Sequence, residues 1–222
     1  MNIPQSAISH GGHSYAFDAT GTLNQVNPQP YPYDAGYIER TYGSIPPESL
    51  AKTAFLRLGL MIGAVGSARL RVLDYGHGGG AFLRACATMP GLEAHGFEIN
   101  GLPVPPGTHA CPDPMAGRWD VVTFYDTLEH IPSLSFLGLL DTRFLVVSVP
   151  DCHAQSKGFD WFWGWKHRKP DEHIHHWNAP ALYHTLKRHG YTGIFTGNPE
   201  DATRKNVPGE PNILTIIARK TH

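Results

Sequence analysis

Apolar residues along the chain fall into short runs of two kinds, which predict strands and helices in turn. The runs at 71–75 (RVLDY) and 143–150 (RFLVVSVP) are almost continuously apolar, which is typical of strands buried on both faces. Between Pro47 and Val65 the apolar residues recur every three or four positions, which predicts an amphipathic helix. The same kinds of run predict further strands at 93–99, 109–113, 119–126, 192–197 and 212–220.

Helices are predicted between these strands. They are expected at 81–89, where the segment follows a group of glycines, at 127–140, and from the capping residue Asn178 to about His189. Alternating strands and helices indicate a parallel sheet, and the last two strands are joined without a helix. The predicted fold class is α/β: a Rossmann-like open sheet with helices on both faces and a terminal antiparallel β-hairpin.

The first 35 residues differ in composition from the rest, being rich in Gly, Pro, Asn and Tyr. The segments SYAF and TLNQV predict a hairpin, and NPQPYPYD predicts an extended connector. We therefore expect residues 1–35 to be an N-terminal appendage without a core of its own. Residues 36–222 are expected to form one domain that begins with helical turns at 34–42 and carries an aromatic lid at about 151–177.

Composition narrows the class of protein. The chain has 222 residues, 41% hydrophobic and 17% charged, with a formal net charge of −1. Such a chain can bury a large core, and its charge disfavours nucleic acid as the main partner. Three widely spaced cysteines do not predict a disulfide framework, and no apolar run is long enough for a bilayer. We expect a cytoplasmic protein with no membrane partner.

The segment LDYGHGGGAFL (73–83) stands where the first strand of the sheet meets its first helix. Glycines at that turn let the backbone approach a ligand closely. Glu98 ends the next strand, where a carboxylate can bind both hydroxyls of a ribose. Asp74 places negative charge beside the loop, which disfavours the pyrophosphate of a dinucleotide. A cationic cofactor with an amino group, such as S-adenosylmethionine, is favoured instead.

Five segments resemble the motifs of one family, in its order, across residues 37–220. VLDYGHGGG resembles the first motif, VLDxGxGxG, of class I S-adenosylmethionine-dependent methyltransferases, and GFEIN resembles their acidic motif. WDVVTFYDTLEHIPS resembles the FDVV…LEHIPDP segment of the subfamily that includes ubiquinone-biosynthesis-type and other small-molecule O-methyltransferases. FLVVSVP resembles the fifth strand, and EHIHHWNAPALYHTLKRHGY resembles the later EHxHxFSPxxLxxLLxxAGF segment.

The resemblance implies roles for particular residues, with S-adenosyl-L-methionine as the cofactor. Glu98 would hold the ribose, Ile99 would lie against the adenine, and Asp113 would reach the adenine amino group. The full set of implied cofactor contacts is Asp74, Tyr75, Gly76, Gly78, Gly80, Glu98, Ile99, Asp113, Tyr125, Asp126, Tyr37 and Tyr42. The sequence departs from the family at His77, where a smaller residue is usual, and at LLDTRF, which replaces Lys-Pro-Gly-Gly.

Histidines and tryptophans are the candidates for the acceptor side. A general base is needed when the acceptor is a weakly acidic hydroxyl, and the candidate catalytic residues are His130, His175 and His176. The aromatic lid offers surfaces that stack on a sugar or an aromatic ring, or pack as a lid on the core. The candidate acceptor-binding residues are Trp161, Trp163, Trp165 and His173. His173 and His175 with Asp171 or Glu172 could bind a metal through alternating imidazoles, but the chain has fourteen histidines, so chance clusters are common and no metal is predicted.

The resulting hypothesis is S-adenosylmethionine-dependent methyl transfer to an oxygen of a small-molecule or sugar-like acceptor. One alternative is methylation of a nucleotide or nucleic acid, if residues 157–170 and Lys187 with Arg188 form one basic face. Another is an inactive cofactor-binding domain that serves as an assembly partner, with residues 1–35 as the interface of a homodimer.

Overall fold

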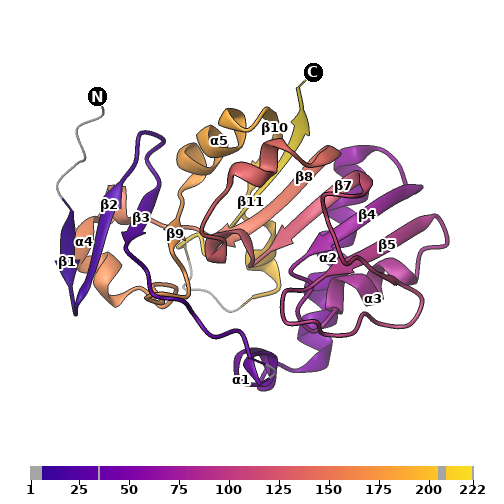
Figure 1. The fold of residues 1–222 in the computed structure, drawn as a ribbon, viewed down its shortest axis with the longest axis horizontal. Helices are drawn as coiled ribbons and strands as arrows, with labels where there is room; N and C mark the ends of the chain where they lie inside the picture. The colour runs from indigo at the N-terminus through magenta and orange to yellow at the C-terminus, as the bar shows by residue number, and fades with distance from the viewer. Residues whose placement is uncertain (1–6, 35, 205–208, 222) are drawn as a thin grey trace.

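The strands of the protein form two sheets (Figure 1). The computed structural model describes residues 7–34, 36–204 and 209–221. In the order of their pairing, the strands of the seven-stranded sheet are β10 (Tyr191–Gly197), β11 (Ile213–Lys220), β8 (Asp141–Pro150), β7 (Arg118–Tyr125), β4 (Leu70–Tyr75), β5 (Leu92–Phe97) and β6 (His109–Ala110).

The pairing in this sheet confirms the predicted fold class. Strands β8, β7, β4, β5 and β6 run parallel to one another, while β11 is antiparallel to both β8 and β10. The chain leaves β4 toward β5 and β6 and then returns to place β7 on the other side of β4. The carboxyl ends of β4 and β7 therefore flank the point where the strand order reverses, which is where ligands bind in open α/β sheets.

Helices cover both faces of the large sheet because neighbouring strand residues point to opposite sides. Val72 faces the core beneath α2 (Pro47–Val65) and α3 (Ala81–Ala87), whereas Leu73 faces the core beneath α5 (Ala179–Arg188). As predicted, α5 begins at Asn178, whose side chain accepts a hydrogen bond from the backbone N–H of Ala181. The layers are visible in Figure 1.

The predicted crossover helix at 127–140 is wrong. Between β7 and β8 the chain forms only two short 3-10 turns, η1 (Leu128–His130) and η2 (Ser135–Gly138). Pro132 restricts the residue before it to extended conformations, and Ile131 adopts φ −91° and ψ 114°. Leu128, Leu137 and Leu140 are still buried, but on turns rather than on one helical face, and Leu139 is exposed.

A second sheet contains the predicted N-terminal hairpin. Its strands pair in the order β1 (Ile8–His10), β2 (His13–Phe17), β3 (Leu23–Val26) and β9 (His175–His176). The outer strands are too short to give a recognisable pattern in the sequence. Tyr15 and Leu23 share a small core with Phe162 of α4 (Ala154–Gly164), so this sheet is stabilised by the predicted aromatic lid.

The connector after β3 runs from the small sheet toward the large one and ends in α1 (Tyr37–Tyr42), below the carboxyl ends of the strands (Figure 1). The connector thus brings N-terminal tyrosines to the edge of the sheet where the glycine loop lies.

No helix in residues 7–34, 36–204 and 209–221 is long and apolar enough to cross a membrane.

Candidate active site

The glycine loop after β4 adopts a conformation that requires glycine. Gly76 has φ +76° and Gly78 has φ +52°, both in the left-handed region. A Cβ atom on Gly76 would lie 2.5 Å from Cγ2 of Thr127. The backbone N–H of Gly78 donates a hydrogen bond of 2.8 Å to the carboxylate of Glu98. The loop and the acidic end of β5 therefore form one unit, as the spacing in the sequence suggested.

Asp74 is buried beneath this loop, and the pKa of its carboxyl is raised. Its Oδ1 accepts a hydrogen bond of 2.8 Å from the hydroxyl of Thr123 on β7. Burial raises the pKa of Asp74 to about 6, although Thr123 and Arg57 act in the opposite direction. His77 lies nearby with its ring against Gly96, where a Cβ atom would come within 2.7 Å of the ring. The glycine on β5 thus makes room for the histidine that departs from the family motif.

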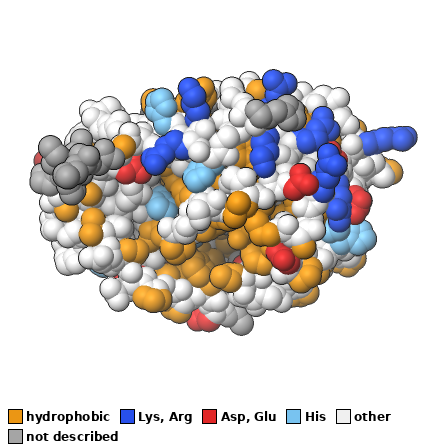
Figure 2. All heavy atoms as spheres, turned by 45° about the horizontal axis from the view of Figure 1, so that its top comes forward, with side chains coloured by type: hydrophobic (Ala, Val, Ile, Leu, Met, Phe, Trp, Pro, Cys, Tyr) orange, Lys and Arg blue, Asp and Glu red, His pale blue; other side chains and the backbone are white. Residues whose placement is uncertain are grey.

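Two cavities meet at the glycine loop. The first has a volume of about 520 Å³ and the second about 480 Å³. Figure 2 shows one face of the molecule hollowed in its middle, where hydrophobic side chains gather and Lys and Arg stand on the rim. The residues that line both cavities are Tyr42, Gly76, Gly78 and Asp126.

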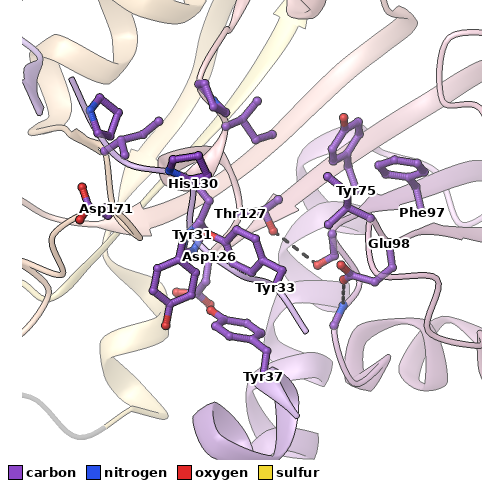
Figure 3. Close-up of a pocket in the computed structure, with 18 of the residues that line it drawn as sticks. Tyr31, Tyr33, Tyr37, Tyr75, Phe97, Glu98, Asp126, Thr127, His130 and Asp171 are labelled. Atoms are coloured by element: carbon purple, nitrogen blue, oxygen red, sulfur yellow. Dashed lines mark hydrogen bonds between the residues drawn. The ribbon is translucent and has the colours of Figure 1, made fainter. Parts of the chain in front are cut away.

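Tyrosines form one wall of the first cavity. Tyr31, Tyr33 and Tyr37 pack ring against ring, with centroids 5.0 to 6.2 Å apart. In Figure 3 they lie opposite Tyr75 and Glu98, across the space that His130 also borders. The hydroxyl of Tyr37 donates to Glu172, which holds α1 against the loop before β9. Sequence analysis predicted Tyr37 and Tyr42 here but missed Tyr31 and Tyr33.

A network of four charged residues lies at the second cavity, and one of its members, Asp126, lines both cavities. Arg57 of α2 donates to Glu200 and Asp126, and Arg204 also donates to Asp126. Burial alone would raise the pKa of Asp126, but Arg204 and Arg57 hold it well below its usual range. Glu200 lies on η3 (Pro199–Ala202), between β10 and β11. Of these four residues sequence analysis predicted only Asp126, because the others lie outside the recognisable motifs.

His130 is held at the tyrosine end of the first cavity. Its Nδ1 is 2.9 Å from the backbone carbonyl oxygen of Glu172 and 2.8 Å from the hydroxyl of Tyr33. A carbonyl oxygen only accepts hydrogen bonds, so we assign the ring proton to Nδ1 and a lone pair to Nε2. Burial lowers the pKa of His130, which keeps the ring neutral at pH 7.

The other predicted histidines lie elsewhere. Both ring nitrogens of His175 have partners, Asn24 at 2.6 Å and the carbonyl oxygen of Ile131 at 3.0 Å. His176 is 3% exposed, and burial lowers its pKa to about 3. Neither residue lines the two cavities, so the structure brings only His130 of the three predicted catalytic residues to them.

The three tryptophans predicted to bind the acceptor pack against one another and against the small sheet. Trp163 stacks on His10 of β1, and Trp161 lies against Trp165 with centroids 5.3 Å apart. None of them lines either cavity. Their positions therefore match the packed-lid interpretation of this segment, and the aromatic wall comes from the N-terminal connector instead.

The remaining predicted cofactor contacts are spread around the glycine loop. Ile99 lines the first cavity and is 77% exposed. Tyr125 lines the second cavity with Arg57 4.1 Å above its ring. Gly80 caps α3 at the edge of the loop. Asp113 lines neither cavity, and its carboxylate accepts a hydrogen bond from the backbone N–H of Met115.

Residues 48–194 match the model of a family described as "Methyltransferase domain". The chain belongs to this family. It is an S-adenosylmethionine-dependent methyltransferase, as the sequence motifs predicted. No curated protein matches the chain.

Solved structures that contain S-adenosylhomocysteine share the fold. A 1,6-didemethyltoxoflavin-N1-methyltransferase from Burkholderia thailandensis, solved with 1,6-didemethyltoxoflavin and S-adenosylhomocysteine, is 14% identical with a TM-score of 0.58, and the match covers 100% of both chains. The N-terminal domain of EvdMO1, solved with S-adenosylhomocysteine, is 16% identical with a TM-score of 0.51, and the match covers 80% of this chain and 82% of that one. At these identities the likeness concerns the fold.

Proposed function

We propose that this methyltransferase transfers the methyl group of S-adenosylmethionine to an oxygen of a small, ring-containing acceptor. The observation that carries the proposal is the first cavity. It runs from Glu98 and the glycine loop to a wall of tyrosines beside His130. Cofactor and acceptor can therefore meet in one cavity of about 520 Å³, which fits a small molecule.

The cofactor is proposed to span both cavities across the glycine loop. One oxygen of the Glu98 carboxylate accepts from Gly78, and the other would bind the ribose hydroxyls. Ile99 would lie against the adenine. The amino-acid part would enter the second cavity, where Asp74 can attract its ammonium group and Arg57 its carboxylate.

Methyl transfer from a sulfonium is an in-line displacement, so most of the catalysis can come from positioning. Tyr31 and Tyr33 present flat faces on which an aromatic or sugar ring can stack. A neutral His130 offers a lone pair at the same end, where a hydroxyl of the acceptor must lose its proton. We propose oxygen as the acceptor atom because the LEHIP segment resembles that of small-molecule O-methyltransferases. The alternative acceptor atom is nitrogen, which the name of the Burkholderia N1-methyltransferase gives for that enzyme.

Calorimetry tests the cofactor part of this proposal. We expect S-adenosylmethionine and S-adenosylhomocysteine to bind and NAD not to bind. Glu98→Ala should weaken cofactor binding by roughly 1–3 kcal/mol, because the site loses a hydrogen-bonding group that faces the ligand. The matched control is Glu93→Ala on the same strand, whose side chain is 54% exposed and outside both cavities. Equal loss in both variants would contradict the assignment of Glu98.

The acceptor part is tested by supplying ring compounds that differ only in the group offered. A matched panel of phenols, anilines and methyl glycosides would be incubated with the cofactor, and release of S-adenosylhomocysteine measured. We expect turnover with hydroxyl compounds. Turnover confined to the amines would overturn the choice of oxygen.

A further inference from the structure

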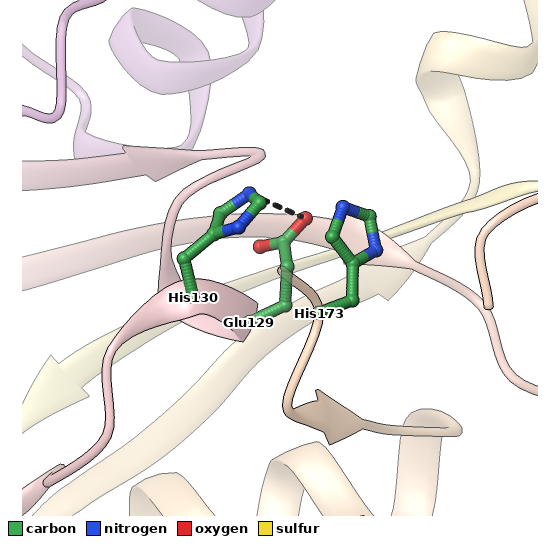
Figure 4. Close-up of side chains that lie close together, drawn as sticks. All are labelled: Glu129, His130 and His173. Atoms are coloured by element: carbon green, nitrogen blue, oxygen red, sulfur yellow. Dashed lines mark ion pairs between the residues drawn. The ribbon is translucent and has the colours of Figure 1, made fainter. Parts of the chain in front are cut away.

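A buried cluster beside the first cavity joins His130 to two residues, Glu129 and His173, that have no role in the scheme above. Glu129 and His130 lie on η1, and His173 lies in the loop before β9 (Figure 4). Each offers one ligand atom, and the three atoms lie within 4.8 Å of one another. The two segments are tied together, because the backbone N–H of Ile174 donates a 2.9 Å hydrogen bond to the carbonyl oxygen of Glu129.

The atoms that face one another in this cluster all carry lone pairs. Nε2 of His130 lies 4.0 Å from Oε1 of Glu129, too far for a direct hydrogen bond. With the ring proton on Nδ1, pointing to the carbonyl oxygen of Glu172, this Nε2 is an acceptor. Ring nitrogens that ligate metals are commonly oriented by such a contact of the other nitrogen with a backbone carbonyl.

Two members of the cluster, Glu129 and His173, carry buried polar atoms that no other described residue pairs with. Glu129 is 1% exposed and His173 is 5% exposed. Both carboxylate oxygens of Glu129 and Nδ1 of His173 lack a hydrogen-bond partner among the described residues. Burying such groups unpaired is unfavourable, and a cation between them would remove the penalty.

We propose that Glu129, His130 and His173 bind a divalent transition-metal ion of the zinc class. Two imidazoles and one carboxylate form a ligand set that zinc uses in catalytic sites, where a fourth position stays open. Magnesium prefers oxygen ligands and fits this set poorly. Ligand atoms about 2 Å from one ion lie at most about 4 Å apart, so the side chains must close by about 1 Å on binding.

The open position of such an ion would serve the proposed methyl transfer, and this step rests on the function proposed above. His130 lines the first cavity, so the ion would face the acceptor. A bound zinc ion lowers the pKa of an oxygen ligand. With Nε2 of His130 bound to the ion, the ion would replace the histidine lone pair as the group that activates the acceptor. The acceptor hydroxyl would release its proton to solvent, and its oxygen would then form a bond to the methyl carbon. The carbon–sulfur bond breaks, and S-adenosylhomocysteine leaves.

The ligand set is tested on the full chain after dialysis against a chelator. Cobalt(II) would be titrated in and its visible absorption recorded, followed by displacement with zinc. We expect one equivalent to bind with the intense bands of low-coordinate cobalt. Glu129→Gln and His173→Gln should each weaken binding at least about tenfold. The controls are His184→Gln on the exposed side of α5 and His109→Gln at β6, which should bind as the unmodified chain does.

Equal cobalt affinity in the Glu129→Gln variant and the unmodified chain would overturn the proposal. If the variants fail to fold, as judged by circular dichroism, X-ray absorption of the zinc-loaded unmodified chain decides instead. Two imidazole ligands support the site, and any other number overturns it. Calorimetry with S-adenosylmethionine on the metal-free chain distinguishes failure of the metal site from failure of the proposed function. If the chain binds the cofactor but no metal, only the metal site is overturned.

Discussion

The proposed cofactor end and the proposed acceptor end of the site are built in opposite ways. At the cofactor end, Asp74, Gly76, Gly78 and Glu98 come from one strand–loop–helix–strand unit. At the acceptor end, Tyr33, His130 and Glu172 come from three segments far apart in the chain and meet through hydrogen bonds to one imidazole nitrogen.

This difference explains why one end was easy to find in the sequence and the other was not. The cofactor end depends on backbone conformation, which glycines at fixed spacing reveal. The acceptor end depends on side chains brought together by the small sheet and the connector after it, and no spacing reveals such a meeting. We expect substitutions at the two ends to separate cofactor binding from acceptor binding.

The largest effect should come from the charge network at the second cavity. Arg57→Met leaves Asp126 and the buried Glu200 with only one arginine, and should lower the free energy of unfolding by about 3–5 kcal/mol. Chemical denaturation measures this. Arg143→Met removes an ion pair whose arginine side chain is 63% exposed, and should change stability by less than about 1 kcal/mol. Similar losses in the two variants would mean that the network is no more than a surface feature.

The next effect isolates the cofactor end. Gly76→Ala places a side chain on a residue with left-handed backbone conformation, which costs about 1–2 kcal/mol. It also brings the new Cβ atom against Thr127. Affinity for S-adenosylmethionine should fall about tenfold or more, measured by calorimetry. Gly59→Ala in α2 meets no atom within 4 Å and should leave the affinity unchanged. Retained affinity in Gly76→Ala would show that the loop does not need this conformation.

The pH dependence of cofactor binding also tests the cofactor end of the site. Because burial raises the pKa of Asp74 to about 6, its carboxyl takes up a proton as the pH falls through 6 and loses the charge that attracts an ammonium group. Affinity for S-adenosylmethionine should be constant above this range and fall by up to about tenfold per pH unit below it. Asp74→Asn should bind more weakly and without that pH dependence. An identical pH profile in both would assign the titration to another group.

The smallest effect isolates the acceptor end. Tyr33→Phe removes the hydroxyl that lies 2.8 Å from His130, which is worth roughly 0.5–1.5 kcal/mol. We expect a higher KM for the acceptor and an unchanged Kd for S-adenosylmethionine. Tyr183→Phe on α5, which lines neither cavity, is the matched control. A change in cofactor affinity alone would show that Tyr33 acts at the cofactor end of the site and not at the acceptor end.

The fold was largely predictable because its elements are strongly patterned. The helix expected at Pro47–Val65 has those bounds, and the strands of the large sheet lie where the apolar runs predicted them. The prediction failed where the local pattern was ambiguous. The apolar residues of 127–140 suited a helix, but Pro132 and the short connection allow only turns.

The sequence by itself determined the fold class and, through five motifs in order, the methyltransferase family. It also indicated the loop of Gly76 and Gly78 and its partner Glu98, because local backbone geometry demands those residue types. Only the tertiary structure decided what surrounds them. It brought Tyr31 and Tyr33 to the cavity, placed the tryptophans on the small sheet, and brought Glu129 close to His173. Such contacts depend on how distant segments pack, and residue spacing along a chain carries no record of that.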